Sequence, residues 1–216
     1  MKIATMADAA EDEEQKKKLS TLADNVVATL EAVVERTTEK LDEASEVVQD
    51  ILKKAAEENG EFALPLKAER LAEMRAEVRK NADSLDEGVI STIFAYMKKA
   101  NEDGLDGMVL IFQKVLQLYA SEELLASKPG DKVLEELLAA DSDSWDGILA
   151  RAMGGETDKD TLLGSVQRSV EKVVLQKASG SYGQRVQAEF LRELMGRIRA
   201  ADEAQGGGST SGDAEA

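Results

Sequence analysis

Apolar residues recur at spacings of three and four along most of the chain, the pattern that one face of an α-helix produces. The longest such run predicts one helix from about residue 12 to 58. Its stripe is narrow and heptad-like, with charged flanks, and consists of Leu19, Ala23, Val26, Leu30, Val33, Thr37, Leu41, Ala44, Val48, Ile51 and Ala55. Such a stripe serves either to pack within its own chain, which is the commoner use, or to pair with a partner helix.

Shorter helices are expected after a break at Asn59-Gly60. In the segment 105–125, apolar residues cover more than half of the circumference of the expected helix, so we expect this helix to be central. The Val-rich stretch 162–174 keeps helical spacing, although its composition also suits a strand. The expected helices cover 65–82 with Pro65 at the start, 84–104, 105–125, a short segment after Asp131, another with Trp145, Ile148 and Leu149, about 160–178 and about 184–202.

Helix starts are predicted from capping residues. Ser84 followed by Glu87 fits a reciprocal capping box. Asp131 is expected to cap the next short helix, and Thr157 with Asp160 the helix from about 160.

Composition supports an all-α protein, because aromatic residues are only 4% and the 216 residues include only two prolines. We expect a long N-terminal helix, an irregular multi-helix bundle and a disordered, Gly-rich C-terminal tail. The expected division is an acidic N-terminal segment with the long helix (1–60), a central helical core (61–127), a C-terminal helical region with a basic edge (128–204) and the tail (205–216).

The residue inventory excludes several kinds of chemistry. The chain has no His and no Cys, which removes His-based triads, thiol nucleophiles, zinc sites and disulfides. A net charge of −16 disfavours broad contact with nucleic acid or anionic lipid. No apolar run is long enough for a transmembrane segment, and the acidic N-terminus lacks the features of a signal or transit peptide, so any targeting segment is expected outside this chain.

Acidic residues offer only weak candidates for a metal or catalytic site. A calcium loop starting at Asp141 would need oxygen ligands where Trp145 and Ala152 stand. Paired carboxylates could in principle serve a hydrolase, but no Asp or Glu is expected within an apolar helix face. The glycine pairs lack the residues of a phosphate-binding loop. We therefore predict no catalytic residue, no metal ligand and no cofactor.

A local basic segment stands out in this acidic chain. Residues 161–200 hold seven Lys or Arg against three Glu, a net +4. Arg185, Arg192 and Arg199 are seven apart and should line one edge of the last helix, with Tyr182 as the nearby aromatic side chain. These four residues are the candidate partner-binding site. The alternative is that the arginines pair with the acidic long helix of the same chain or are simply solvated.

Two stretches resemble a known family. SLDEGVISTIFAYMKKANEDGLDGMVLIFQKVLQLYAS (84–121) and GSYGQRVQAEFLREL (180–194) are similar to a family of uncharacterised plant and algal plastid proteins sometimes labelled endoribonuclease E-like. The resemblance implies the chloroplast stroma and supplies no mechanism. A metal-dependent ribonuclease would need a basic RNA-binding domain and an acidic metal site, and the sequence shows neither.

The leading hypothesis is therefore a non-enzymatic helical scaffold or assembly protein of the stroma, with protein partners. The long helix and the basic C-terminal edge are its expected contact surfaces. The alternative is an accessory RNA-binding protein of plastid transcript processing, which the net charge disfavours. A hydrolase using paired carboxylates is the third hypothesis.

Overall fold

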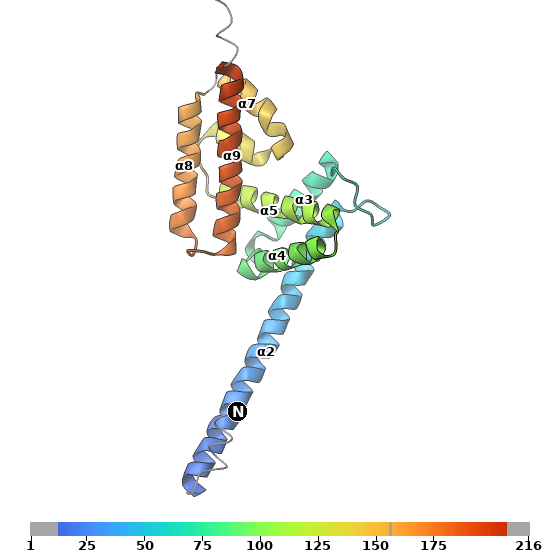
Figure 1. Cartoon of the computed structure of the whole chain (residues 1–216), viewed down its shortest axis with the longest axis vertical. Helices are drawn as coiled ribbons and strands as arrows, with labels where there is room; N and C mark the ends of the chain where they lie inside the picture. Colours follow the sequence, from blue (N-terminus) through green and yellow to red (C-terminus); the bar gives the residue numbers. More distant parts are fainter. Residues whose placement is uncertain (1–12, 156, 207–216) are drawn as a thin grey trace, which may run out of the picture. The chain divides into compact units, whose positions relative to one another are not determined.

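The computed structural model describes residues 13–155 and 157–206, and its α-helices account for most of them (Figure 1). Within these residues there is no β-strand, so the all-α prediction with a long first helix is confirmed. The helices are α2 (Glu13–Ala55), α3 (Ala68–Lys80), α4 (Glu87–Glu102), α5 (Asp106–Ala126), α6 (Lys132–Ala139), α7 (Trp145–Met153), α8 (Lys159–Gln176) and α9 (Tyr182–Gly206). The predicted tail lies outside the described residues except for Gln205 and Gly206, which end α9.

The chain divides into two compact units between Glu46 and Val47, inside α2. The first unit is described from Glu13 as a single helical segment. The second unit contains the end of α2 and helices α3 to α9. No helix in the described part of the chain is both long and apolar enough to span a lipid bilayer.

Helix α5 is central to the second unit, as its wide apolar surface predicted. It contacts α3, α4, α6 and α9, and α9 in turn packs along α8 and against α7 (Figure 1). The buried side chains of α5 cover most of its circumference and are Ile111, Phe112, Val115, Leu116, Leu118, Tyr119, Ala120, Ser121 and Leu124. A helix with so many apolar directions is stable only when neighbours cover it on several sides, and here four helices do so.

The capping box predicted at Ser84 and Glu87 is wrong. Ser84 ends a short 3₁₀ turn, Ala82–Ser84, so the chain enters α4 two residues later. Asp86 is the N-cap, and its carboxylate accepts hydrogen bonds from the backbone N–H groups of Gly88 and Val89. The Glu87 side chain is therefore left free to act elsewhere.

The capping residue predicted for α6 is confirmed, and the one predicted for α8 is wrong. Asp131 caps α6 as predicted, accepting from the N–H groups of Val133 and Leu134 at 3.0 Å each. Asp158, not Thr157, caps α8 by accepting from the N–H and the hydroxyl of Thr161. The Val-rich stretch is helical throughout, within Lys159–Gln176.

Two helix boundaries were predicted too generously. Helix α2 ends at Ala55, before Asn59-Gly60. A separate turn follows at Gly60, which has φ +82° and donates its N–H to the Glu57 carbonyl at 2.8 Å. Helix α3 begins at Ala68, three residues after Pro65.

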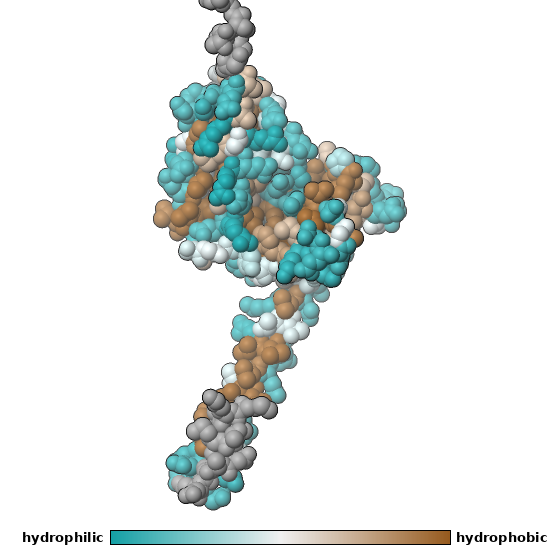
Figure 2. Space-filling view, viewed as in Figure 1, coloured by the Kyte–Doolittle hydropathy of each residue, from teal (hydrophilic) through white to brown (hydrophobic). Residues whose placement is uncertain are grey.

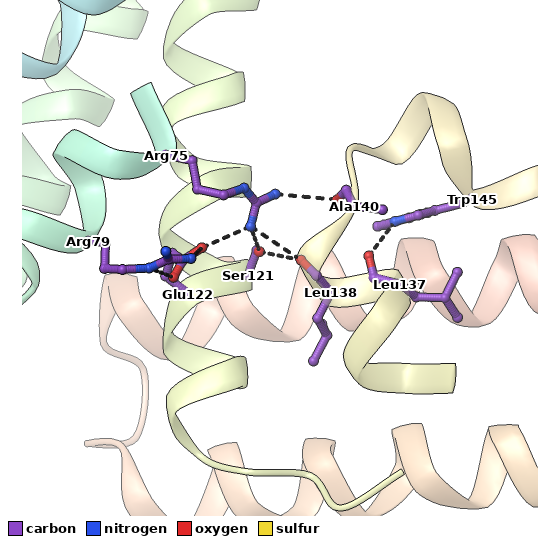
Figure 3. Close-up of polar contacts among 8 residues, drawn as sticks. All are labelled: Arg75, Arg79, Ser121, Glu122, Leu137, Leu138, Ala140 and Trp145. Atoms are coloured by element: carbon purple, nitrogen blue, oxygen red, sulfur yellow. Dashed lines mark hydrogen bonds and ion pairs between the residues drawn. The ribbon is translucent and has the colours of Figure 1, made fainter. Parts of the chain in front are cut away.

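Arg75 ties α3 to α5 and to the end of α6 (Figure 3). Its guanidinium donates to the Ser121 hydroxyl at 2.7 Å and to the Glu122 carboxylate at 2.9 Å. It also reaches the carbonyls of Leu138 and Ala140, at 3.4 and 3.3 Å. These carbonyls lie at the end of α6, where the helix itself supplies no donor, so Arg75 completes that end.

The side chains around Arg75 differ in burial. Arg79 also bonds Glu122, at 2.9 Å, but its side chain is 65% exposed, whereas that of Arg75 is 17% exposed. Nearby, the indole N–H of the buried Trp145 donates to the Leu137 carbonyl at 2.8 Å (Figure 3). Trp145 is the only tryptophan of the chain and reports on this part of the second unit.

Two acidic side chains are shielded within the second unit. Glu77, on α3, is contrary to the expectation that no Asp or Glu would lie within an apolar helix face, whereas Asp141 lies between helices and is outside that expectation. Glu77 is 7% exposed, and a hydrogen bond from Lys80 holds the pKa of its carboxyl below the ordinary value in spite of burial. For Asp141, burial raises the pKa, but hydrogen bonds from the Asp143 N–H and from Lys114 outweigh it, and the pKa is lowered. Both carboxylates are thus held ionised by neighbours.

Candidate functional site

The predicted basic edge begins where α9 begins, and long-range contacts fix that position. The Glu87 carboxylate accepts hydrogen bonds from the N–H groups of Tyr182 and Gly183, at 2.8 Å each. A carboxylate is favoured there because the first N–H groups of a helix have no partner within the helix. Gly183 permits the close approach, since a Cβ would lie 2.7 Å from the Tyr119 hydroxyl and 3.1 Å from the Glu87 carboxylate.

The structure brings the predicted residues Tyr182 and Arg185 together and adds Phe94 of α4 to them. The Arg185 guanidinium lies 5.1 Å from the Phe94 ring centre and 5.2 Å from that of Tyr182. The two rings are 5.3 Å apart and tilted by 33°. Tyr182 remains 41% exposed, so the group presents a cation and an aromatic face at the surface. Sequence reasoning missed Phe94, because only the packing of α4 against α9 places it there.

The remaining predicted arginines behave differently from Arg185. Arg192 pairs with Glu189 on its own helix, and both side chains are exposed. Arg199 is exposed, and none of the ion pairs among the described residues includes it. Arg197, which was not a candidate, pairs with Asp146 of α7 at 3.0 Å. The edge is therefore partly neutralised within the chain, by carboxylates of α9 and α7 rather than of the long helix that the alternative named.

An open groove of about 690 Å³ lies beside Arg185, between α4, α5 and α9. Its apolar lining consists of Phe94, Leu116, Val186 and Phe190. Its polar lining consists of Gln113, Gln117, Arg185, Glu189, Arg192 and Glu193. Two cations and two anions balance at this rim, which suits an apolar side chain with amide contacts better than a phosphate. Arg199 does not line the groove.

A second apolar surface lies on α2, in the first unit. Seven large side chains between positions 22 and 41 are 39–64% exposed; they are Leu22, Val26, Val27, Leu30, Val33, Val34 and Leu41, and we call them the α2 stripe. Apolar surface along this helix is visible in brown in Figure 2. At 100° per residue these positions share one side of the helix. The stripe is wider than predicted, because Leu22, Val27 and Val34 flank the heptad-like positions.

Hydroxyl groups along α2 do not interrupt the stripe. Thr37 stands between Val34 and Leu41 of the stripe, and its hydroxyl donates to the Val33 carbonyl at 2.7 Å. Thr38 donates in the same way to Val34, and Thr29 to Asn25. Each hydroxyl is therefore hydrogen-bonded to the backbone of its own helix.

Within the described parts of the chain, no three Asp or Glu side chains lie close enough to hold one metal ion. The more buried carboxylates, those of Glu77, Glu122 and Asp141, are each held by a Lys or Arg.

Comparisons of the chain with protein-family models, with curated proteins and with solved structures found no match. The α2 stripe and the groove are accordingly the two features from which a function can be inferred.

Proposed function

We propose that this chain is a non-enzymatic helical scaffold or assembly protein of the chloroplast stroma. The α2 stripe is the observation that carries the proposal. A contiguous row of half-exposed Leu and Val side chains costs free energy in water, and such patches typically mark interaction surfaces. A helix face of this kind binds another apolar helix face, so the partner is a protein.

The arrangement of charged groups supports a role without chemistry. General acids, bases and nucleophiles are usually carboxylates or other groups with perturbed pKa values in an accessible cleft. Here the perturbed carboxyls of Glu77 and Asp141 are ion-paired to Lys80 and Lys114, which suits structural contacts. The apolar groove supplies a second surface for a protein contact.

The assignment to the stroma rests on the resemblance to the plastid family. The two stretches that carry it, 84–121 and 180–194, form α4, most of α5 and the first half of α9. These helices contact one another and together line the groove. All residues that line the groove fall within these two stretches, which supports the groove as a family feature.

The test is recovery of stromal proteins from isolated chloroplasts on three immobilised forms of the chain. The wild type is compared with Leu30→Glu/Val33→Glu, which places two charges in the stripe, and with Ala28→Glu/Ala32→Glu. The last variant adds the same charge on the opposite side of α2. We expect defined partners to bind the wild type and the Ala variant and to be lost with the stripe variant, with binding reproduced by the purified partner. Equal recovery on all three forms would remove the stripe as the functional surface.

RNA binding remains the second candidate because Tyr182 and Arg185 present an exposed ring beside a guanidinium, a pairing that can stack on a base. We expect no measurable binding of single-stranded RNA near physiological salt, since the net charge of the chain is −16 and repels phosphate groups. Titrations over a range of salt with the wild type and with Arg185→Gln/Arg192→Gln/Arg199→Gln test this. Sub-micromolar binding by the wild type that the triple variant abolishes would favour the RNA-binding function. Removing each Arg should then also flatten the slope of log affinity against log salt concentration by nearly one unit.

A further inference from the structure

Asn59 and Gly60 lie in the loop that leads from the end of α2 to the start of α3 (Figure 1). Both residues are exposed, and residues 56–67 belong to no helix. The chain has four asparagines, and only Asn59 is followed by glycine; the others are Asn25, Asn81 and Asn101. Because glycine has no side chain, its backbone nitrogen is the least hindered in approaching the side chain of the preceding residue.

The side-chain amide of Asn59 is held at both ends by Glu61. Its Oδ1 accepts a hydrogen bond from the Glu61 backbone N–H at 3.1 Å, and its Nδ2 donates to the Glu61 carboxylate at 2.9 Å. To bond the second residue along the chain, the amide must fold back along the peptide that joins Asn59 to Gly60. The Asn59 Cγ is thereby directed towards the backbone at Gly60 rather than away from the loop.

We propose that Asn59 is a site of deamidation. The Gly60 nitrogen loses its proton to a base in the solvent and attacks the Asn59 Cγ, and the amide nitrogen takes up a proton and leaves as ammonia. The product is a five-membered succinimide ring. Water then adds to one of the two ring carbonyls and opens the ring, which gives aspartate or isoaspartate. Overall, one water is consumed and one ammonia is released, with no oxidation or reduction.

The two contacts to Glu61 match the charges that this reaction creates. Negative charge develops on the Asn59 Oδ1, to which the Glu61 N–H already donates. Positive charge develops on the departing nitrogen, which lies beside the Glu61 carboxylate. Both hydrogen bonds are stronger in the transition state than in the starting amide, and such interactions lower a reaction barrier. Glu61 therefore assists the loss of ammonia.

One contact opposes the reaction. The Gly60 N–H donates to the Glu57 carbonyl at 2.8 Å, and this bond must break before the nitrogen can lose its proton. It is a single bond in an exposed turn, where local opening costs little free energy. Asn25 and Asn101 lie within α2 and α4, so the nitrogen that follows each of them is held in a helix.

Deamidation changes the contacts that shape the loop. It places a carboxylate where the Asn59 amide now donates to the Glu61 carboxylate, and two carboxylates at this separation repel each other. The isoaspartyl product also adds one methylene group to the backbone. The loop is then held by the bond from the Glu57 N–H to the Glu61 carbonyl and by the ion pair of Glu57 with Lys67, at 2.8 and 2.7 Å. We expect it to become easier for a protease to cut.

Peptide mapping by mass spectrometry tests the proposal on the full chain, incubated for days to weeks at mildly alkaline pH. Aspartate and isoaspartate should accumulate at position 59, faster at higher pH because the attacking nitrogen must be deprotonated. The other three asparagines of the same sample should remain amides. An Asn59 that stays an amide in the folded chain overturns the proposal, and so does conversion of the other three at the same rate. A sample unfolded in urea shows whether the fold is what protects Asn59 in the first case.

The part played by Glu61 is tested with Glu61→Gln, which keeps the backbone N–H and removes the carboxylate. Conversion of Asn59 should slow about 3-fold or more, because a neutral acceptor stabilises the departing nitrogen less than a charged one. Glu58→Gln is the matched control, since it removes the same charge from the exposed residue on the other side of Asn59, and it should leave the rate nearly unchanged. Equal rates in the two variants would show that Glu61 gives no assistance. Unchanged Trp145 fluorescence shows that each variant is folded.

The effect on the loop is tested by limited proteolysis. Asn59→Asp imitates the aspartyl product and should be cut within residues 56–67 several-fold faster than freshly prepared wild type. Asn59→Gln forms no five-membered ring, so after the same incubation it should remain unconverted and be cut no faster than before. If wild type that has converted at position 59 is cut no faster than Asn59→Gln, the predicted loosening of the loop is wrong.

Discussion

Replacing Arg75 with Met should destabilise the second unit substantially. Methionine retains much of the apolar stem of the side chain and removes all of its donors. The change deprives Glu122, whose side chain is 12% exposed, of one of its two cations, and removes the donor to the Ala140 carbonyl. Removing one partner of a buried ion pair costs about 3–5 kcal/mol.

Two features reduce that magnitude here. Arg79 continues to hold Glu122, and Ser121 continues to donate to the Leu138 carbonyl. With hydrogen bonds to charged groups contributing about 1.5–3 kcal/mol, we expect a loss of about 2.5 kcal/mol. For a chain of this size that corresponds to a melting temperature lower by about 5–10 °C.

Arg79→Met is the matched control, because Arg79 bonds the same carboxylate from an exposed position. We expect it to cost no more than about 0.5 kcal/mol. Urea unfolding followed by Trp145 fluorescence measures both variants, because the only tryptophan lies in the second unit beside these contacts. The reasoning is refuted if Arg79→Met costs as much as Arg75→Met, or if Arg75→Met costs less than about 1 kcal/mol.

Two further predictions concern single contacts in the second unit. Gly183→Ala should destabilise the fold by about 1–2 kcal/mol, because the added methyl group meets the Tyr119 hydroxyl and the Glu87 carboxylate. Gly196→Ala is the control and should stabilise α9 by up to about 1 kcal/mol, because the added methyl group meets no neighbouring side chain within 4 Å. Thermal unfolding measures both variants, and equal effects would contradict the close contact at Gly183. The pKa of Asp141 is lowered in the folded state, so its ionised form stabilises the fold above its ordinary pKa of 3.8 and this contribution is lost as the pH falls through the folded value. Urea unfolding should therefore show Asp141→Asn to be less stable than the wild type at pH 7, with the difference shrinking below pH 3.8, and a difference independent of pH would show that ionisation is not its source.

Periodicity was sufficient to predict the helices with the strongest patterns. The continuity of α2 and the central position of α5 follow from apolar spacing alone, because a helix buries whichever faces are apolar. Capping positions were harder to choose. Ser84 and Asp86 can both cap the start of α4, and Thr157 and Asp158 can both cap the start of α8. In each case the two residues are at most two positions apart, and the conformation of the turn that leads into the helix decides which of them is the cap.

The candidate site was predictable only in part. The spacing of Arg185, Arg192 and Arg199 placed them correctly on one helix edge, but their partners depend on contacts that spacing does not contain. Phe94 comes from a helix distant in sequence. The stripe of α2 was predicted, whereas its exposure was left open, since the same pattern is used for a core and for an interface.

The contact between Glu87 and the start of α9 links two helices that are far apart in the sequence. On a ribosome, α4 emerges before Tyr182 and Gly183, so the Glu87 carboxylate stays without these two N–H partners until α9 has been synthesised. The apolar faces that α9 covers remain open for the same period, and they include the surroundings of Phe94 and Trp145. The second unit therefore closes late, and a nascent chain stalled before α9 would be a natural client for chaperones.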